Sequence, residues 1–291
     1  MPSMQSSPTW TARDRRHRSR APDPRELSLL EVDLRLDPFD TPWAEMRDAV
    51  RAAADGGFAG IWTPDHLDGR VFGASQVLEC WTTLTAIAVS TSDTKVGPLV
   101  LNVANRDPGL LASMAATLQE IAGGRLLLGL GAGGGAGASG GAGAPLRREQ
   151  EAIGRTVPTD SVRRAQVEAC VQEMRRLWNA PGFLRPDPAP PVVIAAFGPK
   201  MAELAGRVGD GINAPASHPR LGELVAVARD ACVDAGRDSS RFLVTVYSEF
   251  HERWFDADSP ARAELAALRV DRLILYLGPP FDLARRVVTV R

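Results

Sequence analysis

Cysteine, histidine and long apolar runs are all scarce in this chain of 291 residues. Its three cysteines, Cys80, Cys170 and Cys232, are widely spaced and form neither a CxxC pair nor a metal-ligand cluster. This spacing argues against a disulfide framework, and we expect no metal site. Buried, reduced thiols are typical of a cytoplasmic protein, which is the location we expect. No stretch reaches the roughly 18 consecutive apolar residues of a transmembrane helix, so no membrane partner is expected.

An excess of charge of either sign is also missing, because the formal net charge is −1. Neither nucleic acid nor an anionic membrane surface is therefore an expected partner. Arginines gather among serine and proline residues near the N-terminus. We predict a disordered tail over residues 1–28, with a nucleic-acid-binding arm as the alternative, and one domain over 29–291. No apolar segment follows the arginines, so a secretory signal is not expected.

What the chain does contain is a regular alternation of apolar strands and amphipathic helices. Hydrophobic residues make up 44% of it, which is enough for a sizeable core. Strands are predicted over 29–36, 59–63, 95–102, 125–130, 192–197, 211–214, 242–250 and 272–277. Helices are predicted over 42–55, 77–90, 108–122, 160–178, 199–208, 220–236, 260–268 and 281–290.

Two helix starts carry cap signals, Thr41 before Pro42 and Asp160. Residues 129–144 are almost entirely glycine and alanine, and we expect an irregular segment from there to about Pro158. Eight strand–helix units predict an α/β (βα)8 TIM barrel, with a doubly wound open sheet as the alternative.

In such a barrel the reactive groups lie at the carboxyl ends of the strands. The strand that ends at Thr63 is followed by Pro64, which cannot continue a sheet ladder, and then by Asp65 and His66. His17 lies in the tail, so His66 is one of three histidines left for chemistry in the domain. Other strand ends place Asn102, Gly131, Ala196, Phe197, Asn213, Glu249 and His251 on the same rim.

Short motifs along the chain match one protein family in order and spacing. They are GFAGIW at 57–62, PDHL at 64–67, LECWTTL at 78–84, VGPLVLN at 96–102, NRDP at 105–108, AATL at 115–118, GGRL at 123–126, GLGAG at 129–133, PVVIAAFGPK at 191–200 and GDG at 209–211. On these residues the chain resembles the luciferase-like monooxygenase family, whose members bind a flavin or a deazaflavin in a (βα)8 barrel.

The resemblance implies roles for single residues. It implies His66 as catalytic acid or base with Asp65 beside it, and a cofactor ring lying over a non-proline cis bond near Leu99–Val100 with Asn102 in contact. It implies close backbone approach to the ring at the end of the fourth strand. A phosphate site is implied where the fifth strand meets its helix. The cofactor-binding residues expected at these two places are Gly131, Ala132, Gly133, Ala196, Phe197, Gly198, Pro199 and Lys200.

Each of these assignments has a structural alternative. His66 could only shape its loop, Asn102 could cap a turn, and Gly198–Pro199 could simply start a helix. Relatives that use a deazaflavin carry an acid and an amide soon after the glycines, where this chain has Gly134 and Gly137. Trp62, Glu249 and His251 are the expected substrate contacts.

The function expected from the resemblance is hydride transfer between a deazaflavin, coenzyme F420, and a small organic substrate. The alternatives are an FMN-dependent monooxygenase supplied with reduced flavin by a partner reductase, and a barrel that binds flavin or another small ligand without turnover. A flavin or deazaflavin reductase is thus a candidate partner. A homodimer is expected. The apolar faces of the second and third helices, including Leu84, Ile87 and Leu111, are expected to form its interface in addition to packing in the core.

Overall fold

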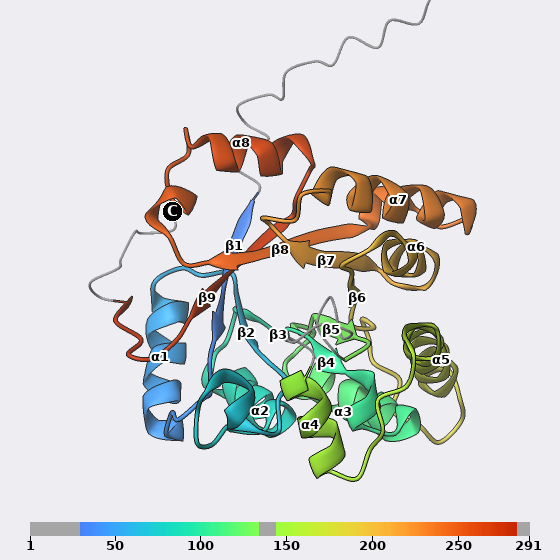
Figure 1. Ribbon diagram of the computed structural model, residues 1–291, viewed down its shortest axis with the longest axis horizontal. Coiled ribbons are helices and arrows are strands. Elements are labelled where there is room, and N and C mark those ends of the chain that lie inside the picture. Colours follow the sequence, from blue (N-terminus) through green and yellow to red (C-terminus); the bar gives the residue numbers. More distant parts are fainter. Residues whose placement is uncertain (1–29, 134–143, 284–291) are drawn as a thin grey trace, which may run out of the picture.

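The computed structural model describes residues 30–133 and 144–283. The predicted tail, the glycine-rich stretch beyond Gly133 and the last predicted helix after Leu283 lie outside these residues. The described part forms a ring of parallel strands surrounded by helices (Figure 1).

Nine strands form one parallel sheet in the order β3-β2-β1-β9-β8-β7-β6-β5-β4. A bridge between Val96 and Leu126 joins β3 to the segment leading into β5 and closes the ring. Because β3 and β4 are two pieces of the one strand predicted over 95–102, the nine strands fill eight positions, and the predicted TIM barrel is confirmed. Their bounds are β1 (Glu31–Leu36), β2 (Gly60–Thr63), β3 (Lys95–Pro98), β4 (Leu101–Asn102), β5 (Leu128–Gly131), β6 (Val192–Ala195), β7 (Gly211–Pro215), β8 (Leu243–Glu249) and β9 (Arg272–Leu277).

Apart from α4, which lies at the carboxyl end of the barrel, the helices follow their strands around the outside of the ring (Figure 1). They are α1 (Trp43–Asp55), α2 (Cys80–Ser90), α3 (Pro108–Ile121), α4 (Ala144–Ala152), α5 (Asp160–Trp178), α6 (Pro199–Val208), α7 (Leu221–Asp234) and α8 (Pro260–Ala267). All three cysteines are free and buried, as expected.

Both predicted caps are wrong by one residue. Pro42 occupies the cap position of α1. The Thr41 hydroxyl does not cap the helix, because it donates a hydrogen bond back to the carbonyl of Phe39 at 2.9 Å. Thr159 occupies the cap position of α5, and Asp160 lies inside the first turn, where it pairs with Arg163 at 2.7 Å.

Helix α4 is a larger correction, because the sequence predicts irregular structure there. Most of its residues are good helix formers, but more than half are charged or polar and they show no apolar period, so the sequence pattern does not indicate a helix there. The helix is fixed instead by two buried polar side chains, Glu149 and Gln150, at 3% and 5% exposure.

The predicted dimer contacts on α2 and α3 are also corrected. Leu84, Ile87 and Leu111 are at most 1% exposed and pack in the hydrophobic core, so they offer no surface to a partner.

The floor of the barrel is a buried polar cluster. Asp33 accepts hydrogen bonds from Trp62 Nε1 at 2.8 Å and from Arg272 Nε and a terminal nitrogen at 2.7 Å each. Gly60 leaves the room for this carboxylate, because a Cβ there would lie 2.7 Å from Asp33 Cγ. The cluster fills the barrel from below and leaves its carboxyl end open.

Close approach of β5 to the end of β3 requires glycine at position 129. A Cβ at Gly129 would lie 2.2 Å from the carbonyl oxygen of Pro98, which is backbone and cannot rotate away. We expect Gly129→Ala to lower the free energy of unfolding by about 1–3 kcal/mol in urea titrations. The matched control is Gly222→Ala in α7, whose Cβ meets only Leu268 Cδ2 at 3.4 Å and should cost nothing. Equal midpoints for the two variants would contradict this packing.

Candidate active site

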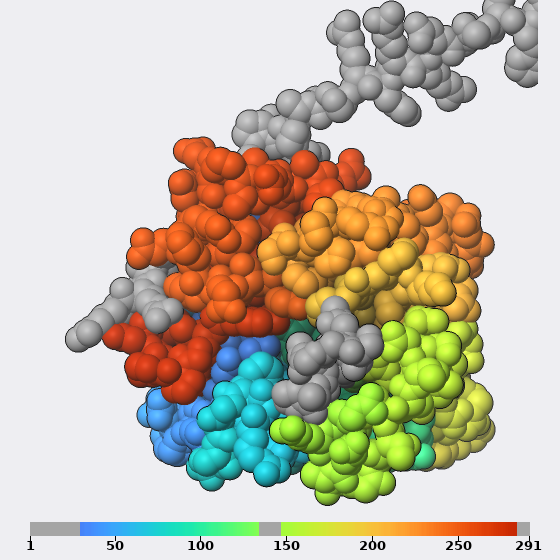
Figure 2. Space-filling model, viewed as in Figure 1, coloured from blue at the N-terminus to red at the C-terminus, as the bar shows by residue number. Residues whose placement is uncertain are grey.

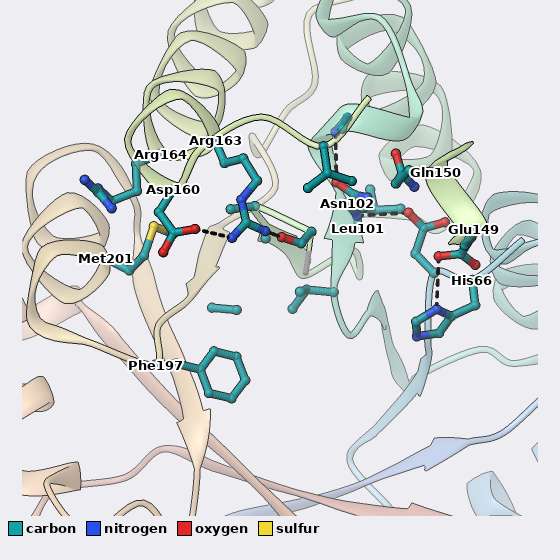
Figure 3. A pocket seen from close by; sticks show the side chains of 18 of the residues that line it. His66, Leu101, Asn102, Glu149, Gln150, Asp160, Arg163, Arg164, Phe197 and Met201 are labelled. Carbon is teal, nitrogen blue, oxygen red and sulfur yellow. Dashed lines mark hydrogen bonds and ion pairs between the residues drawn. The ribbon is translucent and has the colours of Figure 1, made fainter. Parts of the chain in front are cut away.

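A cavity of about 800 Å³ occupies the carboxyl end of the barrel. Its lining comes from the strand ends of β2 and β4 to β9, and from α4, α5 and α6. Figure 2 shows the face on which α4 (yellow-green) lies beside the loop after β2 (cyan). Figure 3 shows the side chains that lie around the cavity.

The strand at the third barrel position separates from β2 where the cavity begins. Leu99 donates the last backbone hydrogen bond to β2, at Thr63, over 2.9 Å. The peptide bond between Leu99 and Val100 is cis, at the position that the resemblance implies. Beyond it, β4 pairs with β5 through Leu101 and Leu130, while no pairing with β2 remains.

The Asp65 carboxylate fills the opening between the ends of β2 and β4. It accepts hydrogen bonds from the Asn102 amide N–H at 2.9 Å, from Asn105 Nδ2 at 3.2 Å and from Arg106 at 2.8 and 2.9 Å. The Asp65 side chain is fully buried, and these four donors satisfy both of its oxygens. Asp65 therefore holds the site together as the buried ion-pair partner of Arg106.

Arg106 joins this carboxylate to the start of α2. It also donates to Glu79 at 2.6 Å, whose carboxylate accepts the amides of Trp81 and Thr82 at 2.9 and 2.7 Å. Burial lowers the pKa of Arg106, but hydrogen bonds and charge from Asp65 and Glu79 outweigh it and raise that pKa above its usual value. Burial raises the pKa of Glu79, but the two amides and Arg106 lower it by more. Both groups thus stay charged near neutral pH.

His66 follows Asp65 directly and lines the cavity (Figure 3). Its ring packs against Phe39 and Phe72, whose centroids lie 5.9 and 4.9 Å away, and these two rings also contact each other. Nδ1 is 3.4 Å from Glu149 Oε2, an ion-pair distance, but the angle does not make a hydrogen bond and Nδ1 is buried without one. The side chain is 16% exposed, so the imidazole remains accessible from the cavity.

Helix α4 brings an amide to the same wall. Gln150 Nε2 donates to Asn105 at 2.8 Å, and Gln150 Oε1 is buried with no hydrogen-bond partner in the described structure. Asn102 lines the cavity and also caps the turn after β4, since its side chain accepts the Ala104 amide at 3.0 Å.

The end of β5 lies beside Asn102 and the cis bond. A Cβ at Gly131 would lie 2.6 Å from Val100 Cγ2, and one at Gly133 would lie 2.4 Å from the Asn102 amide. Gly133 has φ of +63°, which favours glycine, and its carbonyl accepts a hydrogen bond from the buried Arg163. Gly131, Ala132 and Gly133 all line the cavity.

A basic rim faces this strand end. Phe197, Gly198, Pro199 and Lys200 line the cavity where β6 passes into α6, and the open N–H groups of the α6 N-terminus suit an anion. Arg164 on α5 lies on the same side, near Met201 (Figure 3). Ala196 lies just outside the lining as a fully buried residue of the core.

The opposite wall holds the only two tyrosines of the chain, Tyr247 on β8 and Tyr276 on β9. Their rings stack with centroids 5.1 Å apart, and the Arg35 guanidinium lies 3.5 Å from the centroid of Tyr276. Burial raises the pKa of both phenols, so they are neutral near pH 7. The buried Asn213 completes this wall and donates to Thr245 Oγ1 at 2.8 Å.

Three predicted substrate contacts lie away from the cavity. Trp62 is 1% exposed and belongs to the barrel floor. Glu249 is the exposed last residue of β8, and the exposed His251 follows it, with Nδ1 accepting the Arg253 amide at 3.0 Å. The lining residues that sequence reasoning missed include Glu149, Gln150, Arg163, Arg164, Tyr247 and Tyr276, of which only the rare tyrosines carried a usable signal.

Two features absent from the described residues bear on other functions. These residues contain no helix long and apolar enough to cross a membrane. They also contain no group of three or more histidine, cysteine or acidic side chains placed to hold a metal ion.

Removing the Asp65 charge tests its structural role. Asp65→Asn leaves Arg106 buried beside an amide, and we expect the free energy of unfolding to fall by about 3 kcal/mol. The control is Asp48→Asn, which breaks an exposed pair with Arg47 and should change it by at most about 0.5 kcal/mol. Both are read from urea titrations at pH 7. If both variants unfold at the same denaturant concentration as the parent, the Asp65 network does not stabilise the barrel.

Comparison with known proteins places this site in a family. The family described as luciferase-like monooxygenase matches residues 26–271. A 5,10-methylenetetrahydromethanopterin reductase of Archaeoglobus fulgidus is 31% identical over 258 residues, covering 84% of this chain and 70% of the relative. An F420-dependent hydroxymycolic acid dehydrogenase of Mycobacterium tuberculosis is 29% identical over 205 residues, covering 65% and 54%.

A solved structure shares the fold. It is an F420-dependent secondary alcohol dehydrogenase in complex with an F420-acetone adduct, with a TM-score of 0.71 and 18% identity, covering 90% of this chain and 99% of that one. Sequence and fold therefore agree, and the chain belongs to the luciferase-like monooxygenase family.

Proposed function

We propose that this chain is an oxidoreductase that transfers a hydride between coenzyme F420 and a small organic substrate. The observation that carries the proposal is one cavity that brings together His66, the glycine end of β5 and the basic start of α6. Family membership and the F420-dependent relatives support the choice of coenzyme.

The residues present fit such a coenzyme. A cavity of about 800 Å³ has the size of small-molecule sites. Val100 and Ala132 offer apolar surface for a ring, and Gly131 and Gly133 have no side chain to obstruct it. The unpartnered Gln150 Oε1 can accept a hydrogen bond from a ring N–H, in the place of the acid and amide missing after Gly133.

A phosphate fits the start of α6. The free N–H groups of that helix end and its dipole favour an anion, and Gly198 leaves the backbone open because nothing lies within 4 Å of a Cβ there. Lys200 and Arg164 add positive charge on the same side of the cavity.

When bound, coenzyme F420 supplies the hydride chemistry, and the chain supplies orientation and proton transfer. His66 gives or accepts the proton at an imidazole nitrogen, because imidazole can act as an acid or a base and this ring faces the cavity. Asp65 takes no part in proton transfer in this proposal. It fixes the backbone on either side of His66 through Asn102 and Arg106.

FMN-dependent monooxygenation is the second candidate. The family carries that activity in its name, and FMN shares with F420 a ring N–H and a phosphate that the same residues can bind. This function needs reduced flavin, so a reductase is its partner.

We further propose a cytoplasmic homodimer. Its contacts would be the exposed Val89, Leu110 and Ile121 on α2 and α3, in place of the buried residues predicted from the sequence.

Titration of the purified protein with oxidised F420 and with FMN, followed by ring fluorescence, tests the coenzyme. We expect tighter binding of F420. Preferential binding of FMN would transfer the proposal to the monooxygenase, and binding of neither would rule out both enzymes.

His66→Ala tests the proton role, with propan-2-ol and methylenetetrahydromethanopterin among the assayed substrates. We expect kcat to fall by about 10²–10⁴-fold while the Kd for the coenzyme changes little. The matched control is His251→Ala, an exposed histidine outside the cavity, which should leave both unchanged. An equal loss of binding and turnover in His66→Ala would remove His66 from the chemistry.

A further inference from the structure

We propose that Glu149 on α4 is a positioning residue for His66, holding Nδ1 and favouring the protonated ring while the rest of the imidazole faces the cavity. The inference rests on the proposed function in that His66 is the proton-transfer group. It adds α4, which follows the glycine-rich stretch, to the working parts of the site.

Both oxygens of Glu149 face the loop that carries His66. Oε1 accepts the backbone N–H of Leu67 at 2.5 Å and of Asp68 at 3.1 Å, and Oε2 lies 3.4 Å from Nδ1 of His66 (Figure 3). The side chain is only 3% exposed. Among the described residues no lysine or arginine pairs with it, so the imidazole is its one cationic partner.

The two groups complete each other. Nδ1 of His66 is buried with no hydrogen bond of good geometry, which is a costly state for a polar atom. A small rotation of the ring points an Nδ1–H at Oε2, and the adjacent negative charge favours the imidazolium form. With Nδ1 held in this way, Nε2 is the nitrogen left to exchange a proton.

No other residue described around the His66 ring is free to hold Nδ1 in place of Glu149. Phe39 and Phe72 pack on one side of the ring and offer it neither a charge nor a hydrogen-bond acceptor. Asp65 is already satisfied by its four donors.

The other acidic groups near the ring are also engaged elsewhere. Asp37, after β1, interacts electrostatically with His66 and Glu249 but pairs with Arg35 at 2.6 Å. Asp68, in the same loop as His66, pairs with Arg70 at 2.6 Å. From α4, Arg147 also lines the cavity, and its positive charge opposes protonation of the ring.

The test is the pKa of His66 in the cofactor-free protein, from its C2 proton in NMR titrations assigned with His66→Ala. We expect Glu149→Gln to lower this pKa by about 1 unit, because the amide keeps the shape but loses the charge. The matched control is Glu151→Gln, an exposed acid on the same helix, which should leave it unchanged. A folded Glu149→Gln protein with the parent pKa at His66 overturns the proposal.

A second variant covers the case in which Glu149→Gln does not fold. Glu149→Asp keeps the negative charge but moves it away from His66 by the length of one methylene group. We expect the pKa of His66 to fall by less than in Glu149→Gln. An unchanged pKa in a folded Glu149→Asp protein overturns the proposal. In the active enzyme the His66 limb of the pH–kcat profile should move with the NMR value. Because the titration needs no coenzyme, failure of the F420 proposal and failure of the Glu149 proposal give different results.

Discussion

The buried carboxylate of Asp65 is the interaction on which the rest of the site depends. The barrel opens between β2 and β4, where regular strand pairing stops after Leu99, and the exposed backbone must be satisfied in another way. Asp65 does this from one side by accepting the Asn102 amide, and Arg106 neutralises its charge. This opening forms part of the cavity. The next residue, His66, lines the cavity because it follows Asp65 in the same turn.

The site is assembled from elements that precede the glycine-rich stretch in the sequence and elements that follow it. Before it lie the ends of β2, β4 and β5, which are held by hydrogen bonds to Asp65 and by close packing at Gly129, Gly131 and Gly133. After it lie α4, with the buried Glu149 and Gln150, and the basic start of α6. The two sets meet at His66 and Asn105, where side chains from α4 contact the loops after β2 and β4.

Sequence patterns predict the parts whose signal is local. Hydrophobic periodicity indicates the eight barrel positions, and the bounds predicted for α5, α6 and β9 agree with the structure because glycine, proline or a buried run marks their ends. The pattern does not reveal α4, since its polar residues are buried by contacts far away in the sequence. It also cannot separate Trp62 from the cavity, because an inward-facing strand residue can lie either in the floor or on the wall. The resemblance places the cis bond and His66, while the satisfied state of Asp65 depends on Arg106, 41 residues later.

A crystal structure of the protein with oxidised F420 is the most direct test of the account. We expect the coenzyme ring to lie against Val100 and the glycine end of β5. The His66 imidazole should contact the ring or face the adjacent space that is left for substrate. We also expect Asp65 to keep its bonds to Asn102 and Arg106. A ring bound outside this cavity, or an Asp65 that leaves Arg106 to contact the coenzyme, would contradict this account.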